Sequence, residues 1–213
     1  MRRKDELAID KIIECAKREF LERGFEGASM RAIAENAGYT TGMLYGRFAD
    51  KSELFKEIVG NAAEGLYSYY TGVQNAFADL SPEKQYREMH EYVDGKIDGM
   101  LDIVYGNFDE FKLIVCKSKG SEYERFIDRL IEVETVNTGR FISELNAAGI
   151  KIRNVRVDMA HMLATAMFNG MFEVVAHDFD KSEAREYIKD LQYFFNAGWD
   201  KLLGLPSDWK LPE

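Results

Sequence analysis

Apolar residues recur at helical spacing along almost the whole chain. The first segment places them on one face of a helix, at Ile9, Ile12, Ile13, Ala16 and Phe20. Gly24 follows, and glycine is typical just after a helix ends. No stretch shows the two-residue alternation of a half-buried strand. The pattern therefore predicts an all-α protein of about nine helices.

Capping signals divide the chain into these helices. Asp50 with Glu53 reads as a capping box that opens a long helix, and Ser121 with Glu124 reads as another. Ser81-Pro82-Glu83 combines an N-cap, a proline at the first helical position and an acid in the first turn. Further helices are expected at 107–120, 121–149, 154–177 and 181–204.

Residues 28–48 contain two short helical segments, around 30–36 and 41–48. Ser29 and Thr40 are suited to cap them, and Gly38 suits the left-handed residue of the turn between them. Leu44 and Phe48, four residues apart, face inward. Thr41, Gly42, Met43, Tyr45 and Arg47 then point elsewhere. Two short helices joined by a glycine-containing turn indicate a helix-turn-helix.

Residues 9–55 resemble the N-terminal domain of the TetR family of bacterial regulators. The family pattern of a helix ending in F-x-x-x-G-[FY] appears as Phe20 to Phe25. The pattern R-x-I-A-x-x-A-G, then G-x-[LI]-Y and F-x-x-K-x-x-L, appears between Arg31 and Leu54. The resemblance implies an N-terminal three-helix DNA-binding domain, residues 1–50, and a helical ligand-binding and dimerisation domain, residues 51–213.

The resemblance also implies roles for individual residues. Those expected to contact DNA are Ser29, Arg31, Thr40, Thr41, Gly42, Met43, Tyr45, Arg47 and Lys51. Residues 41–43 would face base edges, and the others would hold phosphates. Arg47 and Gly46 depart from the residues common in the family. Since residues 41–43 include no Arg, Asn or Gln, sequence preference would rest on thymine methyl contacts and DNA shape. The alternative is that Ser29 and Thr40 only cap helices and that Tyr45 only packs.

The C-terminal domain is expected to dimerise through its last two helices, both of which carry wide apolar stripes. The predicted interface residues are Met162, Asn169, Phe172, Leu191, Phe195, Trp199 and Leu202. Aromatic residues and methionines in the middle helices also suit an adaptable ligand cavity. The predicted lining is Tyr67, Tyr70, Met89, His90, Met100, Tyr105, Phe111, Phe126, Asn137 and His161. At helical spacing, the same residues also suit a plain hydrophobic core.

Charge and cysteine content bear on the metal sites and cofactors that the protein could hold and on its location. Residues 1–50 carry nine lysines and arginines and nine acidic residues, so the whole formal charge of −9 belongs to residues 51–213. Cys15 and Cys116 match no metal-ligand spacing and are expected to be buried thiols. Glu132 and Glu134 point to different sides of their helix and do not suit a shared metal. We expect no cofactor, no metal, no membrane span and a cytoplasmic location.

Three functions remain to be compared. The favoured one is a repressor, not an enzyme, that binds a pseudo-palindromic DNA operator as a homodimer and is released by a small apolar or amphipathic ligand. The alternative is a DNA-binding regulator without a small-molecule ligand, whose C-terminal domain binds a protein partner. An enzyme on a helical scaffold is disfavoured because no catalytic constellation is present.

Overall fold

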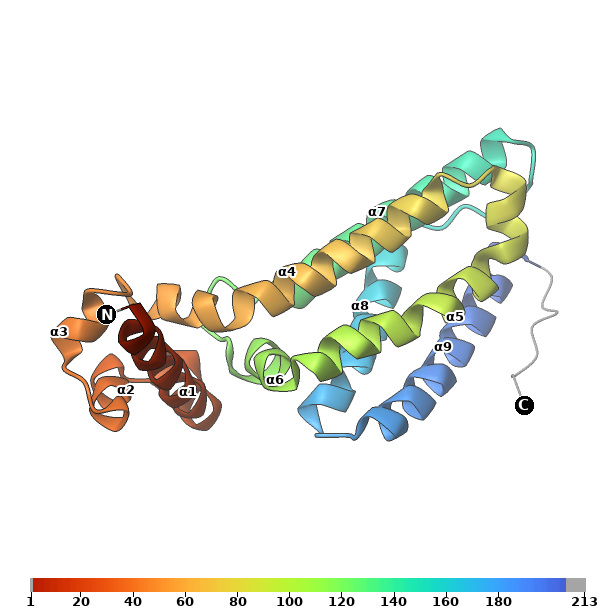
Figure 1. The fold of residues 1–213 in the computed structure, drawn as a ribbon. Coiled ribbons are helices and arrows are strands. Elements are labelled where there is room, and N and C mark those ends of the chain that lie inside the picture. Colours follow the sequence, from red (N-terminus) through yellow and green to blue (C-terminus); the bar gives the residue numbers. More distant parts are fainter. Residues whose placement is uncertain (1, 206–213) are drawn as a thin grey trace. The chain divides into compact units, whose positions relative to one another are not determined.

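The structure is a computed structural model that describes the backbone of residues 2–205, and the side chains of residues 7–92 and 95–205. The described chain is all-α, as predicted (Figure 1). Its helices are α1 (Arg2–Gly27), α2 (Met30–Ala37), α3 (Thr41–Tyr45), α4 (Lys51–Ala78), α5 (Pro82–Gly106), α6 (Phe108–Lys117), α7 (Phe126–Ala147), α8 (Val157–Ala176) and α9 (Lys181–Leu203). None of the helices in these ranges is long and apolar enough to cross a membrane.

The chain forms two compact units. Unit 1 comprises residues 1–65 and 106–126, and unit 2 comprises residues 66–105 and 127–213. The boundary lies inside α4, between Gly65 and Leu66. It differs from the predicted division at residue 50, because the first half of α4 and the segment with α6 pack with α1–α3. The roles expected of residues 1–50 and 51–213 remain predictions.

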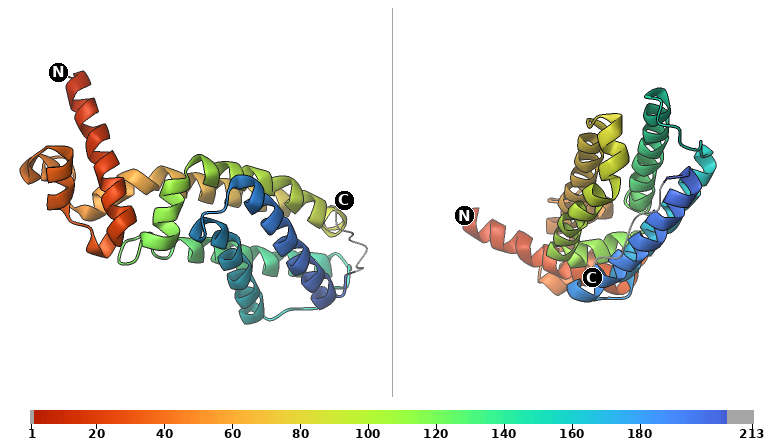
Figure 2. Two further views of the ribbon diagram at one scale, coloured as in Figure 1. Left: turned by 90° about the horizontal axis from the view of Figure 1, so that it is seen from below. Right: turned by 90° about the vertical axis from the view of Figure 1, so that its right-hand side faces the viewer.

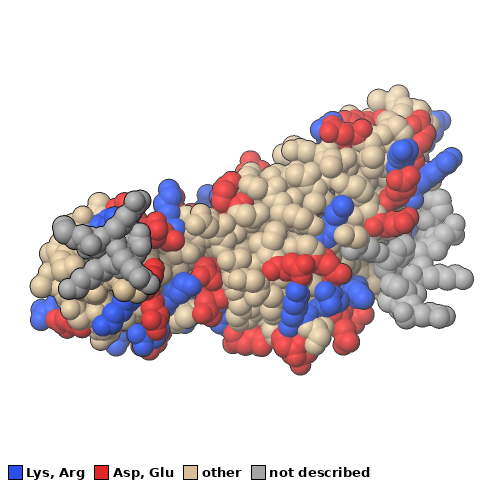
Figure 3. All heavy atoms as spheres, in the orientation of Figure 1, with Lys and Arg blue, Asp and Glu red and all other residues tan. Residues whose placement is uncertain are grey.

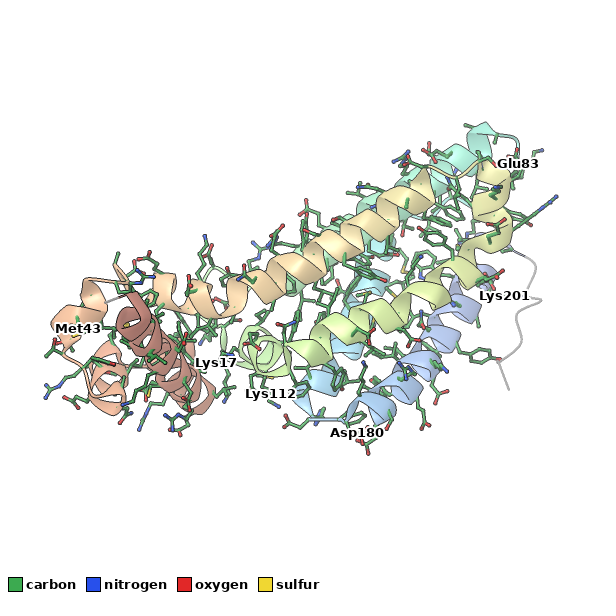
Figure 4. All side chains as sticks on the ribbon, viewed as in Figure 1. Lys17, Met43, Glu83, Lys112, Asp180 and Lys201 are labelled. Carbon is green, nitrogen blue, oxygen red and sulfur yellow. The ribbon has the colours of Figure 1, made fainter. Side chains whose placement is uncertain are left out.

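Unit 1 is built around aromatic rings. The Phe55 side chain on α4 is fully buried. Its ring packs edge-on against the rings of Phe20 and Phe25, with distances between ring centres of 5.0 Å and 5.2 Å. The centre of the Tyr123 ring lies 6.0 Å from that of Phe55. Helix α1 packs against both α2 and α6. A Lys17 side chain on α1 forms an ion pair with Glu110 on α6 (Figure 4). These contacts give unit 1 a densely packed hydrophobic core that supports α2 and α3.

Unit 2 contains the second half of α4 with α5, α7, α8 and α9. Helices α8 and α9 pack together and are joined by the short connection at residues 177–180 (Figure 2). Asp180 caps α9 through a capping box with Glu183. Polar links hold α9 to α5, including Arg185 Nε donating to Asp98 at 2.7 Å. A hydrophobic cluster that includes Leu145 and Leu203 closes one end of the unit.

Most helix ends lie within a few residues of their predicted positions, and the differences at α3 and α7 have local causes. Helix α3 ends at Tyr45 instead of Phe48, because Gly46 follows and glycine is a poor helix former. Helix α7 begins at Phe126 instead of Ser121. The Ser121 hydroxyl accepts from the Tyr123 N–H at 3.1 Å, so Ser121 lies in a turn before the helix instead of opening the helix itself. Cys116 is exposed, whereas the sequence predicted it buried.

Candidate DNA-binding interface and ligand cavity

Helices α2 and α3 form the predicted helix-turn-helix in unit 1. The Ser29 hydroxyl caps α2 by accepting from the Ala32 N–H at 3.3 Å, and the Thr40 hydroxyl caps α3 by accepting from the Met43 N–H at 3.2 Å. Gly38 ends α2 at φ 78° and ψ 28°, a left-handed conformation that a β-carbon disfavours. Both caps and the turn residue therefore agree with the sequence analysis.

The short helix α3 separates buried from exposed side chains sharply. Leu44 is fully buried, and Phe48 after the helix is also buried. Met43 and Tyr45 are each 53% exposed, and Met43 projects from the surface of unit 1 (Figure 4). The Arg47 side chain is exposed and has no ion pair or hydrogen bond with the described residues. The outward face of α3 is thus free to contact another molecule.

Two basic residues expected at DNA have partners within the unit. The Arg31 guanidinium donates to Glu35 at 2.8 Å, and this hydrogen bond raises the pKa of Arg31. The Lys51 ammonium donates to the carbonyl oxygens of Glu26 at 3.0 Å and Ala28 at 3.2 Å, and lies 4.8 Å from the centre of the Phe25 ring. Lys51 therefore holds the segment before α2 in place, a role that the sequence analysis did not foresee.

Basic and acidic side chains are interspersed on the face shown in Figure 3. This agrees with the balanced charge of residues 1–50. The hydroxyls of Ser29 and Thr40 accept from backbone N–H groups, so each keeps its own proton for donation. Cap and phosphate-binding roles are therefore compatible at both residues.

Unit 2 encloses a cavity of about 180 Å³. Its walls come from α4, α5, α7, α8 and α9. They include Tyr70, Val73, Gln74, Phe77, Gln85, Met89, His90, Tyr92, Lys96, Ile97, Met100, Glu134, Asn137, Thr138, Arg140, Phe141, Glu144, Met167, Phe168, Met171, Gln192, Asn196 and Trp199. Apolar and aromatic side chains predominate, with a few polar groups among them, as in small-molecule sites.

The polar groups of this cavity are mostly engaged. His90 Nε2 lies 2.9 Å from Oδ1 of the buried Asp200. Gln85 Nε2 donates to the Leu80 carbonyl at 2.9 Å. Asn196 differs, because its buried Nδ2 has no hydrogen-bond partner among the described residues. A buried amide without an acceptor is costly, and an acceptor atom of a ligand or water would relieve it.

Five of the ten predicted lining residues line the cavity: Tyr70, Met89, His90, Met100 and Asn137. Phe111 and Phe126 do not, because both are buried in unit 1, where their rings contact each other. Tyr67 lies under the Arg129 guanidinium, and the Tyr105 hydroxyl donates to the Phe179 carbonyl. His161 is exposed on α8. Helical spacing identified the apolar faces but not which of them border an empty space.

Comparison with known proteins agrees with the helix-turn-helix geometry. Residues 12–58 match the family described as bacterial regulatory proteins, tetR family. The transcriptional repressor KstR2 of Mycobacterium tuberculosis is 32% identical over 68 residues, which cover 32% of this chain and 34% of that protein. The N-terminal part of the chain, residues 12–58, is therefore similar to the TetR family of bacterial regulatory proteins.

Solved TetR-family structures share the fold over most of the chain. SCO3833 of Streptomyces coelicolor has a TM-score of 0.57 at 19% identity, covering 88% of this chain and 90% of its own. FadR of Bacillus subtilis, solved with stearoyl-CoA, has a TM-score of 0.50 at 14% identity, covering 86% and 97%. By sequence, the match to KstR2 spans about a third of that relative's length.

The residues predicted to form the dimer interface fall into three groups. Met162 is 67% exposed and Asn169 is also exposed. Leu191, Trp199 and Leu202 are half-buried, and Trp199 lines the cavity. Phe172 and Phe195, also predicted at the dimer interface, are buried within the protomer, which leaves little of either side chain for a partner to contact. Phe194, which the sequence analysis did not select, is 71% exposed on α9.

Proposed function

We propose that the protein is a homodimeric transcriptional repressor that binds a pseudo-palindromic DNA operator and is released by a small apolar or amphipathic ligand. The observation that carries this proposal is the outward face of α3. Met43, Tyr45 and Arg47 are exposed there, while Leu44 and Phe48 anchor the segment inward. A TetR-type helix-turn-helix with such a face suits insertion into the major groove.

The contacts to DNA follow from the chemistry of this face. The methyl groups of Thr41 and Met43 suit thymine methyl groups, and Gly42 lets the backbone approach the groove. Tyr45 and the unpaired Arg47 would bind phosphates, joined by the hydroxyl protons of Ser29 and Thr40. Arg31 would have to exchange its Glu35 partner for phosphate. Lys51 would act by holding the backbone before α2.

Dimerisation is supported by exposed apolar side chains on α8 and α9. Met162 and Phe194 are mostly exposed, and Asn169 lies exposed on the same helix as Met162. A two-fold dimer uses the same patch on both protomers and would cover these residues. It would also place two recognition helices about 34–36 Å apart, one turn of DNA, which is what a pseudo-palindromic operator requires.

The cavity in unit 2 supports a small-molecule ligand over a protein partner as the signal. Its apolar walls and the Asn196 amide, which has no hydrogen-bond partner among the described residues, are features of a ligand site. A ligand that binds the DNA-incompetent conformation more tightly would lower operator affinity by that difference. FadR of B. subtilis, which shares the fold, was solved with stearoyl-CoA.

The test measures binding of the purified protein to the DNA upstream of its own gene across a salt series. Specific binding should weaken steeply as salt rises, because phosphate contacts release counterions. Arg47→Ala should lower affinity for all sequences and reduce the salt slope by about one. Arg153→Ala, at an exposed arginine of unit 2, is the matched control and should change neither. Absence of specific binding at any salt would contradict the proposal.

A further inference from the structure

One carboxylate on the cavity wall is held entirely by uncharged groups. Glu134, on α7, accepts hydrogen bonds from the Tyr70 hydroxyl and, at 2.7 Å, from Gln74 Nε2. The Thr138 hydroxyl lies 3.4 Å from its other oxygen. Gln74 also donates to the Tyr70 hydroxyl oxygen at 2.8 Å, which fixes both donors together. The four side chains form a preorganised acceptor site at the cavity surface.

The charge of Glu134 has no partner of opposite sign among the residues that the structure describes. The other cavity carboxylate, Glu144, differs because the Arg140 guanidinium donates to it at 2.6 Å and lowers its pKa. Burial acts in the opposite direction on Glu134 and raises its pKa. A partly shielded carboxylate without a countercharge is unfavourable, and a cation placed beside it removes that cost.

The cavity walls also favour a cation through their aromatic faces. Six aromatic side chains contribute, namely Tyr70, Phe77, Tyr92, Phe141, Phe168 and Trp199. Ring faces carry partial negative charge and attract ammonium groups that have lost water. The protein already uses this interaction at the same cavity, because the Lys96 ammonium lies 5.3 Å from the centre of the Tyr92 ring.

We propose that the ligand of this cavity is a lipophilic monovalent cation, an amine or quaternary ammonium on an apolar body, whose charged group lies beside Glu134. The inference deepens the proposed function by naming its ligand class, and it rests on the proposed ligand site. The net negative charge of residues 51–213 supports this ligand class, since a negative electrostatic field raises the local concentration of cations. Of the cationic side chains at the cavity, Arg140 is paired with Glu144 and Lys96 faces Tyr92.

Three probes with one apolar tail separate charge from hydrophobicity. Octyltrimethylammonium, octanol and octanoate carry positive, zero and negative charge at neutral pH. Their dissociation constants are measured with the full-length protein by calorimetry and by tryptophan fluorescence, since Trp199, one of the two tryptophans of the chain, lines the cavity. Octyltrimethylammonium should bind tightest, on the order of tenfold or more over octanol, because its charge meets an uncompensated carboxylate.

Variants of Glu134 locate the effect. Glu134→Gln should weaken octyltrimethylammonium binding about 10- to 100-fold and leave octanol binding unchanged. Glu134→Asp keeps the charge and should retain the preference for the cation. Glu132→Gln, an exposed carboxylate two residues away on α7, removes the same charge and should change nothing. Circular dichroism and melting temperature confirm that each variant is folded.

The outcomes separate this inference from the proposed function. Equal affinities for the three probes, tighter binding of octanoate, binding of none of them, or a cation preference that survives Glu134→Gln overturns the inference. DNA binding and its response to any other ligand would still stand in those cases. If octyltrimethylammonium binds through Glu134 but leaves operator affinity unchanged, the ligand class is upheld and ligand-driven release from DNA is refuted.

Discussion

The two units use their polar side chains in opposite ways. In unit 1, polar groups hold the backbone around a filled aromatic core, as when the buried Glu19 accepts from the Ser29 N–H at 3.1 Å. In unit 2, polar groups such as Glu134 and Asn196 border an empty volume instead. The packed core of unit 1 therefore holds the outer face of α3 in place. Unit 2 is packed less densely, and this leaves a cavity among its helices. The contrast matches the proposed division between reading DNA and sensing a ligand.

Truncating the centre of the filled unit should have the largest effect. Phe55 is fully buried and its ring contacts Phe20, Phe25 and Tyr123. Phe55→Ala should lower the free energy of unfolding by about 3–5 kcal/mol, because a new cavity replaces the ring. Urea denaturation followed by circular dichroism measures this. A loss below about 1 kcal/mol would show that unit 1 is not densely packed.

Removing the hydrogen bonds of the Lys51 ammonium in unit 1 should have the second-largest effect on stability. Lys51→Met keeps the length of the side chain but leaves the carbonyl oxygens of Glu26 and Ala28 without their donor. We expect a loss of about 1–3 kcal/mol in unfolding free energy. Operator affinity should fall as well, because the segment before α2 loosens. Lys56→Met, on an exposed lysine of the same helix, serves as control and should be nearly neutral.

The matched truncation in the hollow unit should cost less. Phe77 is half-buried, lines the cavity and contacts Tyr92 and Phe141. Phe77→Ala should cost about 1–2 kcal/mol, since it enlarges an existing space and removes less buried area. The same urea titration compares it with Phe55→Ala. Equal losses at the two positions would remove the distinction between a filled and a hollow unit.

The smallest effect should appear only as a dependence on pH. Because burial raises the pKa of Glu134 above its ordinary value of 4.5, the folded protein keeps this proton to a higher pH than the unfolded chain does. Wild-type stability should therefore fall, relative to Glu134→Gln, as pH rises from about 4 to about 7. Melting temperatures across this range test the sign. A wild-type protein that gains stability over the variant would mean that its donors outweigh burial.

Local chemistry explains why unit 1 was predictable. Ser29, Gly38 and Thr40 act within a few residues of their own positions, so their types alone identify two caps and a turn. The pairing of Tyr70 with Glu134 joins residues 64 apart and depends on how α4 meets α7. Sequence periodicity placed Phe111 on an apolar face but did not show that this face fills unit 1. The hydrogen bonds of Lys51 could not be predicted for the same reason, since its carbonyl partners lie more than twenty residues earlier.

The two ends of α3 have a consequence for evolution and for engineering. The Thr40 cap and the buried Leu44 hold this helix, and neither uses a side chain of residues 41–43, since the cap accepts from the backbone N–H of Met43. These three positions can therefore be exchanged without rebuilding the domain. Under the proposed function, gene duplicates could acquire new operators by changing them alone, and a library randomised at Thr41, Gly42 and Met43 would offer a short route to altered DNA specificity.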